Sequence, residues 1–321
     1  MRALVLGCGS IGARHARNLI SLDVEVTVSD PDVRRARALA GTVGATIAER
    51  DDASADIAIV ATPTMRHPED LEWCLGRGMH TFVEKPLAAT RDGLARAVAA
   101  AAANDRVTMV ACNLRFTEGY RALRSNLVRV GRVVSIVADF GWYLPAWRPR
   151  SDYKVGYGAR RETGGGIVLD AGVHEIDYVL DLAGPVSDVA GLWTASGTLG
   201  IDVDDAAEMQ LRHRNGCISQ IHVDYLRRTY TRRCTLVGAD GTLVWDFASG
   251  TVTVTCEPDD PPYQVYQLDP DRNTMYVEEM RHFLQCVATG QRNLNPADSA
   301  AATTEVALQV LEQGGIFQER R

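Results

Sequence analysis

The sequence contains no pair of cysteines at C-x-x-C spacing, although it has seven cysteines in 321 residues. An odd number of widely spaced cysteines argues against a disulfide framework and against a zinc site, and favours reduced, mostly buried thiols. The N-terminus runs directly into a strand pattern with no signal-like leader. The Ala-rich run at residues 94–103 is too short to span a bilayer and is interrupted by Arg96. We therefore expect a cytoplasmic protein without a metal site.

An excess of positive charge is also absent, since 34 Lys and Arg stand against 41 Asp and Glu, for a net charge of −7. This balance gives no electrostatic reason to expect a nucleic acid or an anionic membrane as a partner. Low-complexity segments and internal repeats are missing too. The hydrophobic fraction of 46% and the charged fraction of 23% are ordinary for a globular protein. At roughly 150 residues per domain, the length favours about two domains.

The first third of the chain alternates short apolar runs with stretches of helical spacing. Nearly continuous apolar runs suit parallel strands buried on both faces, and alternation with helices predicts right-handed crossovers. The expected strands are residues 3–6, 24–28, 56–61, 81–84 and 107–111, and the expected helices are residues 11–22, 32–43, 68–76 and 91–103. The pattern predicts an α/β fold with a doubly wound parallel sheet.

The pattern changes near residue 113 to closely spaced segments that alternate apolar with polar residues, separated by turns. This is typical of an antiparallel sheet with hairpins and one face in water. The expected strands are residues 208–212, 217–225, 234–237, 242–247 and 251–256, followed by helices at about 274–288 and 296–313. We therefore expect a dinucleotide-binding domain at residues 1–113 and a second domain at residues 114–321.

A glycine-rich motif, Gly7-Cys8-Gly9-Ser10-Ile11-Gly12, follows the first expected strand and opens the first expected helix. In this context Gly7 permits a tight turn, Gly9 lets the backbone approach a diphosphate, and Gly12 permits close packing of helix and strand. The N–H groups and positive dipole end of the helix would hold the diphosphate. The motif predicts a dinucleotide site, although a simple glycine turn between strand and helix remains the alternative.

Asp30 ends the second expected strand, where an acid hydrogen-bonds the adenosine ribose in such folds. Its charge would repel a 2′-phosphate, so the sequence favours NAD over NADP. Arg14, Arg34 and Arg35 keep NADP open, because a guanidinium could neutralise that phosphate. The alternative role for Asp30 is to cap the next helix.

Two further loops follow expected strands at the carboxyl edge of the sheet, where ligands bind in open α/β folds. Thr62 and Pro63, with His67 shortly after them, form one loop, which is equally compatible with a ligand contact and with a helix cap. Glu84-Lys85-Pro86 forms the other. Lys85 could hydrogen-bond a substrate hydroxyl, or it could be a solvated charge at a strand end.

A glycine run at residues 164–166 precedes a helical pattern in which Asp170, His174, Asp177 and Asp181 share one face. The glycines would let the backbone approach a ligand and introduce a helix. A carboxylate beside an imidazole fixes the orientation of the ring and favours its protonated form. Such a pair suits proton transfer from a hydroxyl. A solvated acidic face on an amphipathic helix is the alternative.

Together, the glycine motif, Glu84-Lys85-Pro86 and the Asp170-x-x-x-His174 pair resemble the Gfo/Idh/MocA family of NAD(P)-dependent oxidoreductases, over nearly the whole chain. The resemblance implies a Rossmann domain followed by an α/β domain with a large, open, mostly antiparallel sheet. It also implies homodimers or homotetramers that pack through this sheet. The Lys85-Pro86 bond is often cis in such enzymes.

The resemblance also implies roles for single residues. Lys85, Asp170 and His174 match the catalytic residues of the family, with His174 as general acid/base, Asp170 as its partner and Lys85 on the substrate hydroxyl. The cofactor-binding residues it implies are Gly7, Gly9, Ser10, Ile11, Gly12, Asp30, Thr62, Pro63, His67, Glu84, Lys85 and Asn113. The expected substrate-binding residues are Lys85, Arg115, Trp147, Arg148, Tyr153, Asp170 and His174, with Arg150 as a further candidate for an oxyanion clamp.

The resulting hypothesis is an NAD-dependent dehydrogenase or ketoreductase that acts on a sugar, a sugar derivative or a cyclitol. One alternative is an enzyme that oxidises its substrate transiently, for epimerisation or elimination, and keeps its NAD bound. Another is a non-catalytic regulator that senses a nucleotide. The presence of Lys85, Asp170 and His174 together argues against the regulator, because a sensor does not need all three.

Overall fold

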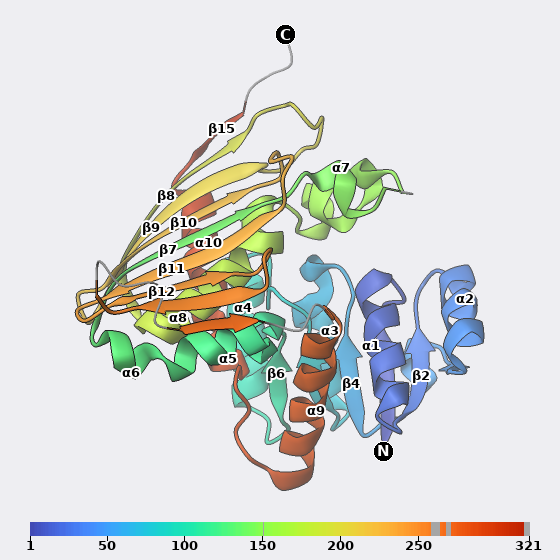
Figure 1. Ribbon diagram of the computed structural model, residues 1–321. Coiled ribbons are helices and arrows are strands. Elements are labelled where there is room, and N and C mark those ends of the chain that lie inside the picture. Colours follow the sequence, from blue (N-terminus) through green and yellow to red (C-terminus); the bar gives the residue numbers. More distant parts are fainter. Residues whose placement is uncertain (150, 258–263, 268–270, 318–321) are drawn as a thin grey trace. The chain divides into compact units, whose positions relative to one another are not determined.

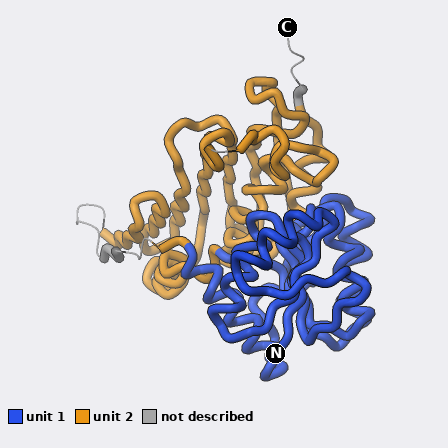
Figure 2. The backbone as a smooth tube through the Cα atoms, turned by 90° about the vertical axis from the view of Figure 1, so that its right-hand side faces the viewer, with its two compact units in different colours: residues 1–113, 273–304 blue, residues 114–272, 305–321 orange. Residues whose placement is uncertain are grey.

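The computed structural model describes residues 1–149, 151–257, 264–267 and 271–317. The chain divides into two compact units, coloured separately in Figure 2. Unit 1 comprises Met1–Asn113 and Asn273–Thr304, and unit 2 comprises Leu114–Arg272 and Glu305–Arg321. None of the helices in the described ranges combines the length and hydrophobicity needed to cross a membrane.

Unit 1 contains a six-stranded parallel sheet with the strand order β3-β2-β1-β4-β5-β6 (Figure 1). Its strands are β1 (Arg2–Leu6), β2 (Glu25–Ser29), β3 (Thr46–Ile47), β4 (Ile57–Val60), β5 (His80–Val83) and β6 (Thr108–Val110). Its helices are α1 (Ser10–Ser21), α2 (Val33–Val43), α3 (His67–Gly76), α4 (Arg91–Ala102) and α9 (Thr274–Thr289). The predicted doubly wound sheet is therefore confirmed. Among the six strands of this sheet, the sequence pattern failed to predict only the two-residue edge strand β3.

The apolar runs form this sheet because both of its faces are covered. All four residues of β4 are 0% exposed, and Leu4 and Val5 of β1 are equally buried. Helix α1 packs against α2 and α9, and α3 packs against α4. A strand buried on both faces has no polar side to alternate with, which explains the continuous hydrophobic pattern.

The segment Asn273–Thr304 belongs to unit 1, whereas the sequence placed it in a second domain of residues 114–321. Two asparagine side chains attach it to the edge strand β6: Asn293 donates to the carbonyl of Thr108 at 2.9 Å, and Asn295 to that of Val110 at 3.1 Å. Local pattern does not reveal this return, because the partner residues lie 185 positions apart.

Unit 2 contains a nine-stranded sheet with the order β14-β13-β12-β11-β7-β10-β9-β8-β15. Only the pairs β7/β10 and β8/β15 among the described strands of this sheet are parallel, so the predicted large, mostly antiparallel sheet is confirmed. The sequence pattern missed β7, β8, β14 and β15. The strands are β7 (Val133–Gly141), β8 (Val186–Ala195), β9 (Ala206–His213), β10 (Ile218–Asp224), β11 (Thr231–Gly238), β12 (Thr242–Asp246), β13 (Thr251–Thr255), β14 (Gln264–Gln267) and β15 (Gly315–Phe317).

One face of this sheet is covered by helices of the same unit. Helix α8 packs on β7 and β10, and α5 packs on β12 and β13. Along β9, Met209 and Leu211 are buried while Glu208 and Gln210 are exposed, so the strand alternates between core and solvent. The remaining helices are α5 (Glu118–Ser125), α6 (Leu127–Val130), α7 (Leu144–Trp147), α8 (Val173–Ala183) and α10 (Ala297–Glu312), which continues from unit 1 into unit 2.

Short turns carry several of the candidate site residues. The 3-10 turns are Arg50–Asp52, Thr64–Arg66, Asn113–Phe116, Tyr153–Val155, Tyr157–Ala159 and Arg161–Thr163. A π-helical turn, Val168–Gly172, leads directly into α8. The sequence predicted an ordinary α-helix at this point.

Candidate functional site

The glycine motif lies between β1 and α1 in unit 1, and close packing explains two of its three glycines. Gly7 has a φ of +93°, and a Cβ there would lie 2.5 Å from the carbonyl oxygen of Ala61. A Cβ on Gly12 would lie 1.9 Å from the carbonyl oxygen of Gly7. A larger residue at Gly7 would displace the turn from the chain that follows β4, and one at Gly12 would displace α1 from the turn.

Gly9 differs from the other two because, apart from its immediate neighbours in the chain, no described atom lies within 4 Å of where its Cβ would be. It is also the N-cap of α1, and among the described side chains none caps this helix. The helix start at Ser10 and Ile11 therefore presents uncapped backbone beside an open space. This arrangement fits a diphosphate group, which takes the N–H groups and the positive dipole end of a helix.

Asp30 follows β2, and its carboxylate is tied to the glycine loop. Oδ2 accepts the backbone N–H of Cys8 at 2.7 Å, and Oδ1 accepts that of Asp32 at 2.8 Å. Arg35 Nη1 lies 3.5 Å from Oδ2. Asp32, not Asp30, caps α2, by accepting from Arg34 N. An ionised carboxylate keeps acceptor capacity after these contacts, so Asp30 fits a ribose hydroxyl.

Lys85 follows β5 and is half-buried, and the Lys85–Pro86 bond is cis, as the resemblance implied. Its neighbour Glu84 is buried and points into unit 1, where Oε1 lies 2.7 Å from Nε2 of His15. The other carboxylate oxygen accepts the Lys85 backbone N–H at 3.2 Å. Burial favours the neutral carboxyl, but the His15 hydrogen bond and the nearby charges outweigh it and lower the pKa of Glu84. Glu84 and His15 thus hold the turn that carries Lys85.

His67 also holds loops together. Its ring is 1% exposed, with Nδ1 2.7 Å from the carbonyl oxygen of Pro86 and Nε2 2.8 Å from that of Thr62. Burial lowers the pKa of this imidazole, while the two carbonyl groups act in the opposite direction. The ring therefore links the loop after β4 to the loop after β5. Both of its nitrogens face the protein, which leaves neither directed at a cofactor.

The other predicted cofactor residues of unit 1 differ in accessibility. Thr62 is half-buried and donates its hydroxyl to Asp70 at 2.7 Å, while Pro63 is exposed. Asn113 is 5% exposed, and its side-chain oxygen has no hydrogen-bond partner among the described residues. An unpaired buried amide oxygen is costly unless a ligand or water satisfies it, so Asn113 fits a ligand-binding role.

In unit 2, the π-helical turn Val168–Gly172 presents Asp170, and α8 presents His174. Both side chains are half-buried, whereas Val168, Leu169, Val173 and the other residues between and beside them are buried. The two polar groups therefore lie at the accessible edge of an otherwise buried segment. A π-turn often marks a functional position in a helix, because it shifts the side chains that follow it.

The glycine run before this turn contacts protein rather than open space. A Cβ on Gly165 would lie 2.4 Å from the carbonyl oxygen of Tyr157, and one on Gly166 would lie 2.0 Å from Asp204 Oδ1. Asp204 lies between β8 and β9, and its Oδ2 accepts the Val168 N–H at 2.8 Å. Burial, followed by smaller contributions that include the charge of Asp205, raises the pKa of Asp204 to about 6. Gly166 thus admits the Asp204 carboxylate that accepts the first N–H of the π-turn, while Gly165 admits the backbone of the preceding turn.

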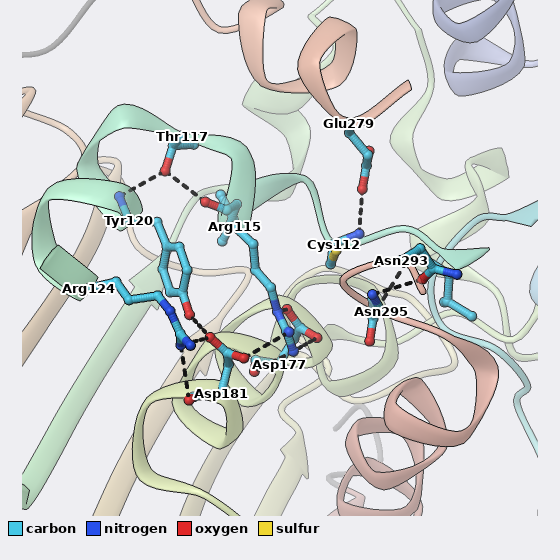
Figure 3. Close-up of polar contacts among 12 residues, drawn as sticks. Cys112, Arg115, Thr117, Tyr120, Arg124, Asp177, Asp181, Glu279, Asn293 and Asn295 are labelled. Atoms are coloured by element: carbon cyan, nitrogen blue, oxygen red, sulfur yellow. Dashed lines mark hydrogen bonds and ion pairs between the residues drawn. The ribbon is translucent and has the colours of Figure 1, made fainter. Parts of the chain in front are cut away.

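Asp177 and Asp181, which the sequence placed on the same polar face as His174, instead form a cluster with Arg115 (Figure 3). Arg115 binds Asp177 with Nε at 2.7 Å and Nη2 at 2.8 Å, and its Nη1 lies 3.1 Å from Asp181. Tyr120 and Arg124 also bind Asp181. The side chains of Arg115 and Asp177 are each only 9% exposed.

This cluster corrects two expectations. Arg115 is not directed at a substrate anion, because two carboxylates of its own unit occupy its guanidinium. Asp177 does not belong to an accessible polar face beside His174, because it is buried and paired with Arg115. Burial raises the pKa of Asp177, and Arg115 opposes that shift. The cluster fastens Arg115 and α5 to α8 within unit 2.

The remaining predicted substrate residues lie near the start of unit 2. Trp147 is half-buried, stacks on Trp142 with ring centroids 5.2 Å apart, and donates its N–H to the Trp142 carbonyl. Arg148 is exposed, and Tyr153 donates its hydroxyl to the carbonyl of Leu199 at 2.8 Å. Arg150 lies outside the described residues.

Three residues that support the predicted site were missed by the sequence analysis: His15, Asp204 and Tyr225. Tyr225 donates its hydroxyl to Asp170 Oδ2 at 3.0 Å. His15 lies three residues after Gly12 on the same helix, which was a usable signal. The other two follow or precede strands of the second sheet, and nothing in their local sequence indicates a contact with Asp170 or its helix.

Comparison with known families gives two matches that together span most of the chain. Residues 1–112 match the model described as oxidoreductase family, NAD-binding Rossmann fold. Residues 120–244 match the model of the GFO/IDH/MocA C-terminal domain.

Individual relatives are similar over nearly the full length. Myo-inositol 2-dehydrogenase of Thermotoga maritima is 27% identical over 316 residues, which cover 91% of this chain and 89% of the relative. Among solved structures, UDP-N-acetylglucosamine 3-dehydrogenase from Acidithiobacillus ferrooxidans has a TM-score of 0.83 at 20% identity, covering 98% of this chain and 97% of that one. Levoglucosan dehydrogenase in complex with NADH and levoglucosan has a TM-score of 0.86 at 18% identity, covering 98% and 96%. At these identities the structural matches establish the fold.

Proposed function

Because the chain belongs to the GFO/IDH/MocA oxidoreductase family, whose first domain is an NAD-binding Rossmann fold, we propose that it is an NAD-dependent dehydrogenase or ketoreductase. Its substrate is a sugar, a sugar derivative or a cyclitol with a reactive CH–OH carbon. The observation that carries this proposal is the pair Asp170 and His174, half-buried and four residues apart in a segment that is otherwise buried.

The roles of the residues follow from their chemistry. His174 accepts the proton of the substrate hydroxyl during oxidation and returns it during reduction, the role of general acid/base that an imidazole commonly takes in enzymes. Asp170 orients the imidazole and stabilises its protonated form. Lys85 donates a hydrogen bond to the same substrate oxygen and favours its alkoxide character. Bound NAD supplies the hydride acceptor.

The cofactor residues act by binding and orientation. Gly9 leaves space at the start of α1 for the diphosphate, and Ser10 and Ile11 supply backbone N–H groups there. Asp30 accepts hydrogen bonds from the adenosine ribose, and its charge selects NAD over NADP. The nicotinamide half of the cofactor contacts Thr62, Pro63 and Asn113. Glu84 and His67 do not contact it but fix the loops after β4 and β5.

The proposed class of substrate rests on the relatives and on the aromatic groups of unit 2. The relatives named above act, by their names, on an inositol, an anhydrosugar and an amino sugar nucleotide. Trp147 contacts the ring of Tyr225, which in turn contacts Asp170, so an aromatic surface lies one side chain from the proposed catalytic carboxylate. An aromatic face suits the C–H face of a sugar ring. Arg148 and Tyr153 complete the proposed substrate side.

The test is a substrate panel of inositols, free sugars, sugar acids and nucleotide sugars, each assayed with NAD and with NADP. The expected result is NADH formation with at least one polyol, at a specificity constant on the order of 10⁴ M⁻¹ s⁻¹ or more, as is typical of enzymes. Turnover of a substrate without net NADH would favour the transient-oxidation alternative. Tight NAD binding with no conversion of any member would favour the nucleotide-sensing alternative and contradict the proposal.

We also propose a cytoplasmic homodimer or homotetramer that packs through the open face of the unit 2 sheet. Large apolar residues on its strands, Leu192, Val137 and Ile218, are 73%, 47% and 58% exposed. Exposed apolar groups on a sheet face are typical of an interface between subunits. Light scattering should give twice or four times the monomer mass of 35.0 kDa, and Val137→Lys should shift it to the monomer.

A further inference from the structure

Tyr225 is a buried residue whose phenol hydroxyl contacts the carboxylate of Asp170. It follows β10 directly and is 0% exposed. Its hydroxyl lies 3.0 Å from Asp170 Oδ2 and 3.4 Å from the carbonyl oxygen of Gly158. A phenol has one proton to donate, and a carboxylate is the stronger acceptor at the shorter distance. Tyr225 therefore donates to Asp170.

The surroundings of Tyr225 reserve space for this contact. A Cβ on Gly158 would lie 2.6 Å from Asp170 Oδ2 and 2.8 Å from the Tyr225 hydroxyl, so only glycine fits there without displacing one of them. The ring of Trp147 packs edge-on against Tyr225 with centroids 5.3 Å apart. The Tyr225 backbone N–H donates to the carbonyl oxygen of Asp205 at 2.8 Å. Backbone, ring and hydroxyl are thus each fixed by a separate contact.

We propose that Tyr225 is a positioning residue for the reaction: its hydroxyl holds the Asp170 carboxylate in the orientation in which it serves His174. This inference rests on the proposed function of the Asp170 and His174 pair. The side chain of Tyr225 is fully buried, so it acts through Asp170 and does not touch the substrate.

The phenol also keeps its proton across the working pH range. Burial, and next the negative charge of Asp170, raise the pKa of Tyr225 well above the ordinary value of 10. Tyr225 therefore remains a hydrogen-bond donor to Asp170 at neutral pH.

The experiment compares two tyrosines that both donate to a carboxylate on the segment 168–183 (Asp170 and Asp181). Tyr225→Phe removes only the hydroxyl next to Asp170. Tyr120→Phe is the matched control, because Tyr120 is 3% exposed and binds Asp181 within the Arg115 cluster. On the substrate identified by the panel, we expect Tyr225→Phe to lower kcat by about 10- to 100-fold, the scale of one hydrogen bond to a charged group. We expect KM to change by less than about threefold, and Tyr120→Phe to keep kcat within about twofold.

A coupling measurement separates a positioning role from general damage. In an Asp170→Ala background, Tyr225→Phe should change kcat by less than about twofold, because the group through which it acts is gone. An equal loss of kcat in both backgrounds would overturn the proposal, as would full activity of Tyr225→Phe.

A second readout does not depend on turnover. The imidazole of His174, assigned in NMR spectra by comparison with His174→Gln, should show a shifted titration midpoint in Tyr225→Phe and an unchanged one in Tyr120→Phe. An unchanged midpoint in both variants would overturn the inference. Failure of the wild-type protein to oxidise or reduce any member of the panel contradicts the proposed function instead, and leaves the NMR result to decide the role of Tyr225.

Discussion

Arg115 and Asp177 form a two-point ion pair in the interior of unit 2, with Nε at 2.7 Å from one carboxylate oxygen and Nη2 at 2.8 Å from the other. Such a pair fixes both side chains and satisfies several donors at once. The same guanidinium contacts Asp181, so one arginine joins two acids that lie one turn apart on α8. On this helix, Asp177 and Asp181 therefore have a structural role, and its first turn carries His174.

Arg115→Ala should destabilise the protein without altering substrate recognition. Removing one partner of a buried pair leaves Asp177 uncompensated, which costs about 3–5 kcal/mol of unfolding free energy. Urea denaturation measures this loss. Arg124→Ala, at a guanidinium that is 54% exposed in the same cluster, serves as the control and should cost less than about 1 kcal/mol. If Arg115→Ala instead had a much larger KM for the substrate and unchanged stability, Arg115 would be a substrate-binding residue.

Lys85→Met and His174→Asn should separate chemistry from cofactor binding. Loss of a general acid/base costs about 10²- to 10⁴-fold in kcat. The affinity for NADH should stay within about twofold in His174→Asn, because the groups proposed to hold the dinucleotide remain in place. Stopped-flow turnover and fluorescence titration of NADH provide the two measurements. Full activity in both variants would show that neither residue takes part in the reaction.

Asp30→Asn should weaken the preference for NADH over NADPH. The amide oxygen can still accept one backbone N–H of the glycine loop, so the fold should persist, while the charge that repels a 2′-phosphate is lost. We expect the ratio of dissociation constants to change by about tenfold or more, equivalent to roughly 1.4 kcal/mol. Tighter binding of NADPH than NADH by the wild-type protein would contradict the role assigned to Asp30.

Gly166→Ala should disrupt the π-turn that carries Asp170. The new Cβ would lie 2.0 Å from Asp204 Oδ1, at a backbone φ of +111° that alanine rarely adopts. We expect a loss of about 1–3 kcal/mol in stability and a lower kcat. Gly41→Ala is the control: this glycine lies inside α2 with no described atom within 4 Å of its Cβ position, so alanine there should stabilise by about 0.5–1 kcal/mol. Equal behaviour of the two variants would contradict this role of Gly166.

Asp204 should make stability depend on pH in the weakly acidic range. Its pKa of about 6 in the folded protein exceeds the ordinary value of 3.8. Between these values the folded state holds a proton that the unfolded state has lost. The stabilisation that this proton gives the folded state is therefore fully present below pH 3.8 and is lost as the pH rises through 6. The two pKa values correspond to up to about 3 kcal/mol. Asp204→Asn should lack this dependence when unfolding free energies are measured at several pH values between 4 and 7. A parallel pH dependence in both proteins would exclude Asp204 as its source.

Local sequence determined the fold of residues 1–113 apart from β3, but not the return of Asn273–Thr304 to the same unit. The apolar runs gave the core strands of unit 1 because each is buried on both faces, and Gly7, Gly9 and Gly12 marked the turn because a side chain at Gly7 or Gly12 collides with the neighbouring backbone. Both kinds of signal depend on interactions that a few adjacent residues express by themselves. The four-residue spacing of Asp170 and His174 is also visible in one segment of the sequence, whereas the π-turn and their half-buried positions became visible only in the structure.

Only the tertiary structure decided which polar groups are available for chemistry. Arg115 and Asp177 look as suitable for a site as Asp170 does, until the fold brings them together across 62 positions and buries them. Tyr225 reaches Asp170 from 55 positions away. Whether an ionisable group is used in a buried ion pair or stays available for chemistry depends on the charges that long-range packing brings next to it. The positions of those charges depend on the whole chain and not on the residues adjacent in sequence.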